Sequence, residues 1–144
     1  MRVPPERLRR WIEVLDHVEG YARLLRRRLG PVAVVLHGSY ARGDFNLWSD
    51  VDVIVVSPAY RGVRPLDRYE ATPTPPPGFE LIPWTPEEAR LQLARPAWRQ
   101  ALARGHAIVV DEVGLADAIA EAGLRPAWLR ELRARIARPP GPRG

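Results

Sequence analysis

The sequence predicts an α/β protein of the α+β kind, a mixed sheet of about four strands with helices mainly on one face. Two observations predict it. Short apolar segments alternate with helix-like segments along the chain, which is typical of sheets covered by helices. The 144 residues are enough for one hydrophobic core but not for two. We therefore expect a single domain over residues 1–144, with a helical C-terminal third from about residue 86 and a frayed tail over 139–144.

The first two elements are a long helix and a buried strand. Apolar side chains recur at steps of three and four over residues 5–29, which predicts an amphipathic helix. Gly30 and Pro31 end it. The run VAVVLH over residues 32–37 is continuously apolar and predicts a strand covered on both faces. Residues 39–49 are too polar for a strand and have room for one helical turn.

Three more strands are expected further along. The run VDVIVV over residues 51–56 predicts the second strand, FELI over 79–82 the third and AIVV over 107–110 the last. Residues 60–77 contain several prolines and predict a long loop that is either functional or disordered.

Helices dominate the rest of the chain. Thr85 followed by Pro86 and two glutamates is typical of a helix start, with a capping hydroxyl and acids in the first turn. The expected helices cover residues 85–95, 96–105, 115–122 and 126–137.

Composition narrows the class of protein. All 22 basic residues are arginine, and the net charge of +5 favours polyanionic partners such as nucleotides, RNA or an acidic protein surface. There is no cysteine, which excludes disulfides and thiolate metal sites. No run approaches the roughly 18 apolar residues of a membrane span, and no signal peptide is recognisable. We therefore expect a cytoplasmic protein without a membrane partner.

Two aspartates at the start of the second strand carry the chemistry. Residues two apart in a strand point the same way, so Asp50 and Asp52 project their carboxylates together. They repel each other unless a cation lies between them, and Mg²⁺ prefers such oxygen ligands. The pattern indicates a metal site, with a simple strand-entry turn as the alternative.

The residues after the first strand are expected at the same corner. If the first two strands pair antiparallel, Gly38 and Ser39 lie beside the aspartates. Glycine lets a phosphate approach the backbone, and the following amides and hydroxyl can donate to its oxygens. Arg42 either meets phosphate or is a solvated charge, and His37 is interpreted as a structural residue.

Metal-assisted nucleotidyl transfer usually needs a third carboxylate. Glu80 is the best candidate, because it is a lone charge inside the apolar run FELI. The alternative interpretation is that Glu80 is an exposed residue without a catalytic role on a half-buried strand.

Gly38-Ser39, ten residues, then Asp50-Val51-Asp52 resembles the signature of the polymerase-beta-like nucleotidyltransferase superfamily. The fuller string GSYARGD…SDVDVIVV is similar to its small prokaryotic branch, the minimal nucleotidyltransferases, and the resemblance covers about residues 8 to 115. It implies the nucleotidyltransferase fold, with Asp50, Asp52 and Glu80 as the metal-binding triad. It also implies that Ser39 contacts the nucleotide phosphates.

The resemblance further implies an enzyme that uses two Mg²⁺ ions and a nucleoside triphosphate, ATP. It would transfer AMP from ATP to a hydroxyl group. Such proteins are often paired with a helical HEPN protein as antitoxin and toxin, and some adenylylate a tyrosine of that partner. Because the chain is small, little of it is left to form an acceptor site, and we expect a macromolecule to complete the cleft. The candidates are a HEPN-type protein, an RNA acceptor and a second copy in a homodimer. The alternative functions are a non-catalytic, nucleotide-binding antitoxin that blocks its partner sterically and an RNA-binding protein that uses the arginines.

Overall fold

The computed structural model describes residues 3–137 and contains a four-stranded mixed sheet. Its strands are β1 (Ala33–His37), β2 (Val51–Val56), β3 (Phe79–Trp84) and β4 (His106–Asp111), in the order β3-β2-β1-β4. β1 pairs antiparallel with β2 and with β4, whereas β2 and β3 are parallel. The predicted mixed sheet is therefore confirmed. The tail over residues 139–144, expected to be frayed, lies outside the described residues.

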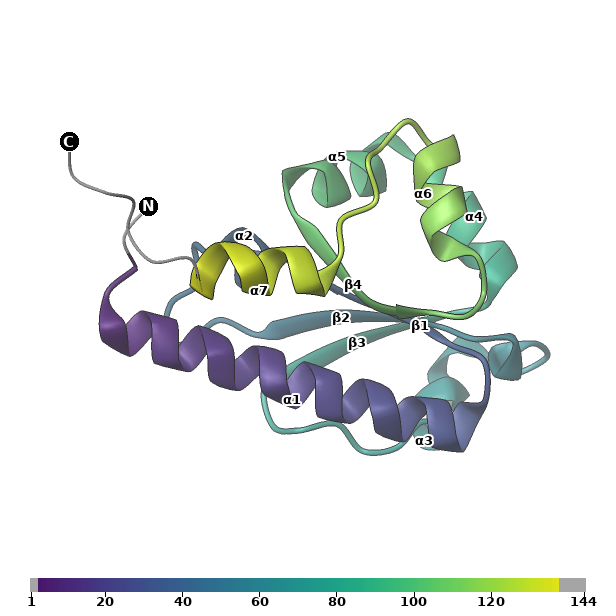
Figure 1. Ribbon diagram of the computed structural model, residues 1–144. Helices are drawn as coiled ribbons and strands as arrows, with labels where there is room; N and C mark the ends of the chain where they lie inside the picture. The colour runs from purple at the N-terminus through teal and green to yellow at the C-terminus, as the bar shows by residue number, and fades with distance from the viewer. Residues whose placement is uncertain (1–2, 138–144) are drawn as a thin grey trace.

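The helices follow the predicted segments closely (Figure 1). They are α1 (Pro5–Leu29), α2 (Ser39–Arg42), α3 (Arg68–Ala71), α4 (Pro86–Leu93), α5 (Pro96–Arg104), α6 (Leu115–Glu121) and α7 (Leu129–Ala137). The capping box expected at Thr85 is present, because its hydroxyl accepts from the Glu88 amide at 3.1 Å while the Glu88 carboxylate accepts from the Thr85 amide. Within the described chain, none of the helices combines the length and apolar character that a bilayer crossing requires.

Helices cover both faces of the sheet, so the prediction that they lie mainly on one face is wrong (Figure 1). α1 and α7 pack on the face that carries Val34, and α4, α5 and α6 pack on the face that carries Val35. The reason lies in the strands themselves. Alternate residues point to opposite faces, and the central strands are apolar at nearly every position, so each face needs its own cover.

The proline-rich segment between β2 and β3 is a structured crossover. Parallel strands need such a connection, because the chain must return to the end of the sheet where it started. Short helical turns fill it, including α3 and two 3₁₀ turns, at Pro58–Tyr60 and Pro65–Asp67. The buried Arg68 side chain donates to the Pro83 carbonyl at 3.1 Å and to Glu88 at 2.6 Å. These bonds tie the crossover to β3 and so help to position the residues that β3 carries.

Candidate active site

Three strands bring polar side chains together at one end of the sheet. Asp52 on β2 lies directly opposite His37 on β1 and directly opposite Glu80 on β3. Side chains of directly opposed residues point to the same face of a sheet, here the face that α4, α5 and α6 cover further along. Asp50 precedes Asp52 by two residues at the open end of β2 and is exposed. We call Gly38, Asp50, Asp52 and Glu80 the acidic corner.

Gly38 allows Asp52 to occupy this corner. Its φ of +72° is a conformation that favours glycine. A Cβ at this position would also lie 2.2 Å from Oδ2 of Asp52, closer than any side chain permits. The antiparallel pairing of β1 with β2, on which the sequence prediction depended, is thus observed, and the turn after β1 lies against the Asp52 carboxylate.

The acidic corner is electrostatically strained without a cation. The pKa of Asp52 is raised above its ordinary value of 3.8, first by burial, then by the negative charges of Glu80 and Asp50, and Arg42 opposes these effects. Burial and the Arg42 charge lower the pKa of His37 to about 4, so its imidazole is neutral at pH 7 and adds no positive charge. A bound cation would relieve the repulsion among the carboxylates.

The donor chemistry of the acidic corner fits Mg²⁺. Among residues 3–137, no group of three or more acidic or histidine side chains is arranged so that it could hold a metal ion by itself. Magnesium usually takes one or two protein carboxylates and completes its shell with substrate phosphates and water. Asp50 and Asp52, with Glu80 opposite, therefore fit an ion that binds together with a triphosphate.

Buried contacts with α1 hold α2, which begins at Ser39 directly after Gly38. The Trp11 indole N–H donates to the Tyr40 carbonyl at 2.7 Å. The Arg7 guanidinium donates to the carbonyls of Gly43 at 2.9 Å and Phe45 at 2.6 Å. The segment that follows β1 is therefore fixed on the side facing α1, while its Ser39 end lies next to the acidic corner.

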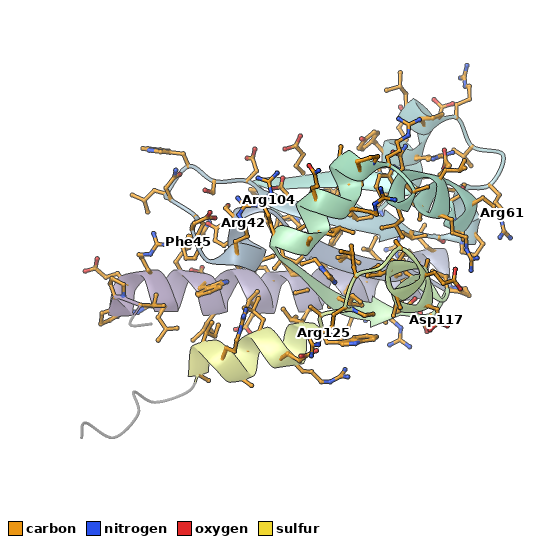
Figure 2. The ribbon with its side chains drawn as sticks, turned by 90° about the horizontal axis from the view of Figure 1, so that it is seen from above. Arg42, Phe45, Arg61, Arg104, Asp117 and Arg125 are labelled. Carbon is orange, nitrogen blue, oxygen red and sulfur yellow. The ribbon has the colours of Figure 1, made fainter. Side chains whose placement is uncertain are left out.

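Arg42, the last residue of α2, lies between the acidic corner and the turn from α5 to β4. Its Nε donates to the Asp44 carboxylate at 3.1 Å, and its charge acts on both Asp52 and His37. A Cβ on Gly105 would lie 2.8 Å from Cγ of Arg42, so the absence of a side chain there leaves room for the arginine stem. Figure 2 shows Arg42 next to Arg104, at the end of α5.

The structure brings the predicted site residues to one end of the sheet, with Ser39 and Arg42 on α2 beside the acidic corner. His37, interpreted from the sequence as a structural residue, was not expected beside the aspartates. It lies directly opposite Asp52, and its Nε2 is buried without a hydrogen-bond partner in the described part of the chain. Its place immediately before Gly38 was the available signal, since antiparallel pairing puts that position beside the aspartates.

Comparison with known proteins agrees with this geometry. The model of the nucleotidyltransferase domain family matches residues 18–105, which include the whole acidic corner. The crystal structure of a proposed nucleotidyltransferase from Sulfolobus solfataricus is similar, with a TM-score of 0.55 and 20% identity over 61% of this chain and 81% of that chain. At this identity the likeness supports the fold. No match is found among curated proteins.

The family match covers more than half of the chain and contains both the Gly38-Ser39 turn and the Asp50-Val51-Asp52 unit. The mixed sheet places these two motifs against each other, as antiparallel pairing of the first two strands predicted. This chain therefore belongs to the nucleotidyltransferase domain family, within the polymerase-beta-like superfamily.

Proposed function

We propose that this protein transfers AMP from ATP, with Mg²⁺, to a hydroxyl group on a macromolecular acceptor. The observation that carries the proposal is the placement of Asp52, which faces Glu80 across the parallel strands and lies against Gly38 at the turn after β1. One end of the sheet thus combines carboxylates for a metal with a glycine turn for phosphates. The resemblance to the minimal nucleotidyltransferases supports ATP as the donor.

Each residue of the acidic corner, together with Ser39, has its own role in this proposal. Asp50 and Asp52 would hold two Mg²⁺ ions, with Glu80 as the third carboxylate. When bound, such ions lower the pKa of an attacking hydroxyl and neutralise a pyrophosphate leaving group. The backbone of the Gly38 turn would approach the β- and γ-phosphates, and the Ser39 hydroxyl would donate to them.

The acceptor enters from the β3 side in this proposal. In-line displacement puts the attacking and leaving oxygens on opposite sides of the transferred phosphorus. With the leaving phosphates at Gly38, in the turn after β1, the attacking hydroxyl comes from the side of Glu80, which is exposed on the edge strand β3. An open edge of this kind can admit a macromolecule, and a HEPN-type protein, as in a toxin–antitoxin pair, is the first acceptor we propose. RNA and a second copy of this chain are the alternatives.

The test is transfer of label from α-labelled ATP in the presence of Mg²⁺. Wild type is compared with Asp52→Asn and Glu80→Gln, with the genomic-neighbour protein or total RNA as acceptor. Asp117→Asn is the matched control, because Asp117 is an exposed carboxylate on α6, away from the acidic corner (Figure 2). We expect label on an acceptor with wild type and the control, and loss with both site variants. Transfer that survives Asp52→Asn would exclude the proposed site.

A non-catalytic, nucleotide-binding antitoxin is the second candidate. It would use the same Gly38-Ser39 turn to hold the nucleotide but requires no transfer. In that case wild type and Asp52→Asn neutralise the partner equally, and neither one labels it. If Asp52→Asn binds the partner but fails to neutralise it, catalysis is required.

A further inference from the structure

A positively charged cavity lies beside the acidic corner. It has a volume of about 760 Å³ and is lined by α2, the end of α5, the segment between α6 and α7, and α7 itself. Among its described lining residues one is a glutamate, Glu131, and four are arginines, each from a different segment: Arg42, Arg104, Arg125 and Arg135. We call it the arginine cavity.

Two of these arginines are available for a ligand. Arg104 and Arg135 are exposed, and neither forms an ion pair with another residue in the range 3–137. Arg125 pairs with Glu131 at 2.6 Å, and Arg42 pairs with Asp44 at 3.1 Å. The cavity therefore keeps a positive charge after its internal ion pairs are counted.

Apart from His106, the remaining wall consists of apolar and small residues. Leu124, Trp128 and Leu132 line it alongside the arginines. Trp128 forms a parallel bridge with Ile108 of β4, so the segment before α7 covers the edge of the sheet. The His106 ring lies between the Leu102 carbonyl and the Ala127 amide, at 2.8 and 3.0 Å. These contacts give the cavity a defined shape.

We propose that the arginine cavity binds a phosphorylated nucleoside. This ligand is additional to the donor nucleotide, and in that respect the inference rests on the proposed function. Guanidinium groups match phosphate oxygens in pairs, and an apolar wall suits a base and ribose. The volume lies within the roughly 300–1,000 Å³ of sites for ligands of this size.

The position of the cavity separates it from the acceptor route. It lies at the β4 edge, beyond Gly38 and Arg42, whereas Glu80 is on the opposite edge strand. A ligand here would lie on the leaving-phosphate side of the acidic corner, with Arg42 shared between the two sites. The phosphorylated nucleoside can come from a free nucleotide or from the end of an RNA strand, which present the same chemistry.

The test is calorimetry in a chelating buffer, where carboxylates without metal disfavour a triphosphate in the acidic corner. The probes are AMP, ATP and 5′-phosphorylated hexaadenylate. Because a charge-assisted hydrogen bond contributes about 1.5–3 kcal/mol, we expect the double variant Arg104→Gln/Arg135→Gln to bind at least about tenfold more weakly than wild type. The matched control is Arg90→Gln/Arg95→Gln, two exposed arginines on α4 and directly before α5 that do not line the cavity.

The probes distinguish the two sources. Equal affinity for AMP and hexaadenylate indicates a free nucleotide, and tighter, more salt-sensitive binding of hexaadenylate indicates an RNA end. The proposal is overturned if no probe binds at millimolar concentration, if both double variants bind like wild type, or if hexaglutamate binds as tightly as the nucleotides.

Asp52→Asn separates this inference from the proposed function. In the chelating buffer it should leave nucleotide binding unchanged, because Asp52 does not line the cavity. A change in affinity would place the ligand in the acidic corner and overturn the inference while leaving the proposed function intact. If nucleotide binding persists but the protein shows no transferase activity, the inference stands and the proposed function fails.

Discussion

The two faces of the sheet differ most at the end where β2 begins. On the face that packs against α1, the strands stay apolar to their ends, since Leu36, Val51 and Val53 are at most 2% exposed. On the other face, α4, α5 and α6 cover residues such as Ile54 and then leave the end of the sheet open. Three polar side chains occupy that open end: His37, Asp52 and Glu80.

This difference shows how one short strand can serve stability and chemistry together. Neighbouring residues of a strand point to opposite faces, so Asp52 faces the acidic corner while Val51 and Val53 are in the core. The core on the α1 face holds the strands in register whatever the charge on the other face. Substitutions on the two faces should therefore have separable effects.

The largest effect is expected for Asp52→Asn, on activity alone. Loss of one metal-binding carboxylate removes several kcal/mol of transition-state stabilisation, so transfer should fall about a thousandfold or more. The free energy of unfolding without metal should stay the same or rise, since an amide does not repel Glu80. Label transfer and urea unfolding of the same preparation measure both. A large loss of stability would show that the two faces are not independent.

The complementary change is Leu36→Ala, which acts on the α1 face. Leu36 is fully buried, so the cavity left behind should lower the free energy of unfolding by about 2–5 kcal/mol. The folded fraction should still bind ATP and Mg²⁺. Urea unfolding with calorimetry checks both, and Leu91→Ala, at a position 67% exposed on α4, should stay within about 0.5 kcal/mol of wild type.

Gly38→Ala should lower both stability and transfer, because Gly38 needs a positive φ and lies against the Asp52 carboxylate. The positive φ costs about 1–2 kcal/mol for alanine, and the new Cβ displaces the Asp52 carboxylate, so transfer should drop more than about tenfold. Gly62→Ala is the control. Its φ is +77° and no atom lies within 4 Å of the new Cβ, so it carries the backbone cost without the displacement. Equal transfer by the two variants would refute the contact argument.

The smallest expected effect is a pH dependence of stability. The pKa of Asp52 is raised in the folded state, so its ionisation destabilises the metal-free protein as pH rises through that pKa. Below the ordinary value of 3.8, wild type and Asp52→Asn should unfold at the same temperature, and toward neutral pH the variant should unfold at the higher one. Thermal unfolding in a chelating buffer measures the difference, and added Mg²⁺ should reduce it. A variant less stable at neutral pH would reverse the assigned sign.

The sequence by itself determined the elements whose signal is local. The periodicity of residues 5–29 and the apolar run at 51–56 predicted α1 and β2 with their observed bounds, because helix and strand periods are properties of neighbouring residues. The spacing between Gly38-Ser39 and Asp50-Val51-Asp52 likewise indicated one corner, since a short excursion between antiparallel strands must return to the same edge.

Only the tertiary structure decided which segments distant in sequence come together. The parallel register of β2 and β3 brings Glu80 opposite Asp52, and the proline-rich crossover between them conceals that register from any local pattern. Helices on both faces, the position of His37 opposite Asp52 and the arginine cavity depend equally on long-range packing. Each requires contacts among segments whose relative positions are set by burial of the whole chain, and no short stretch of sequence carries that information.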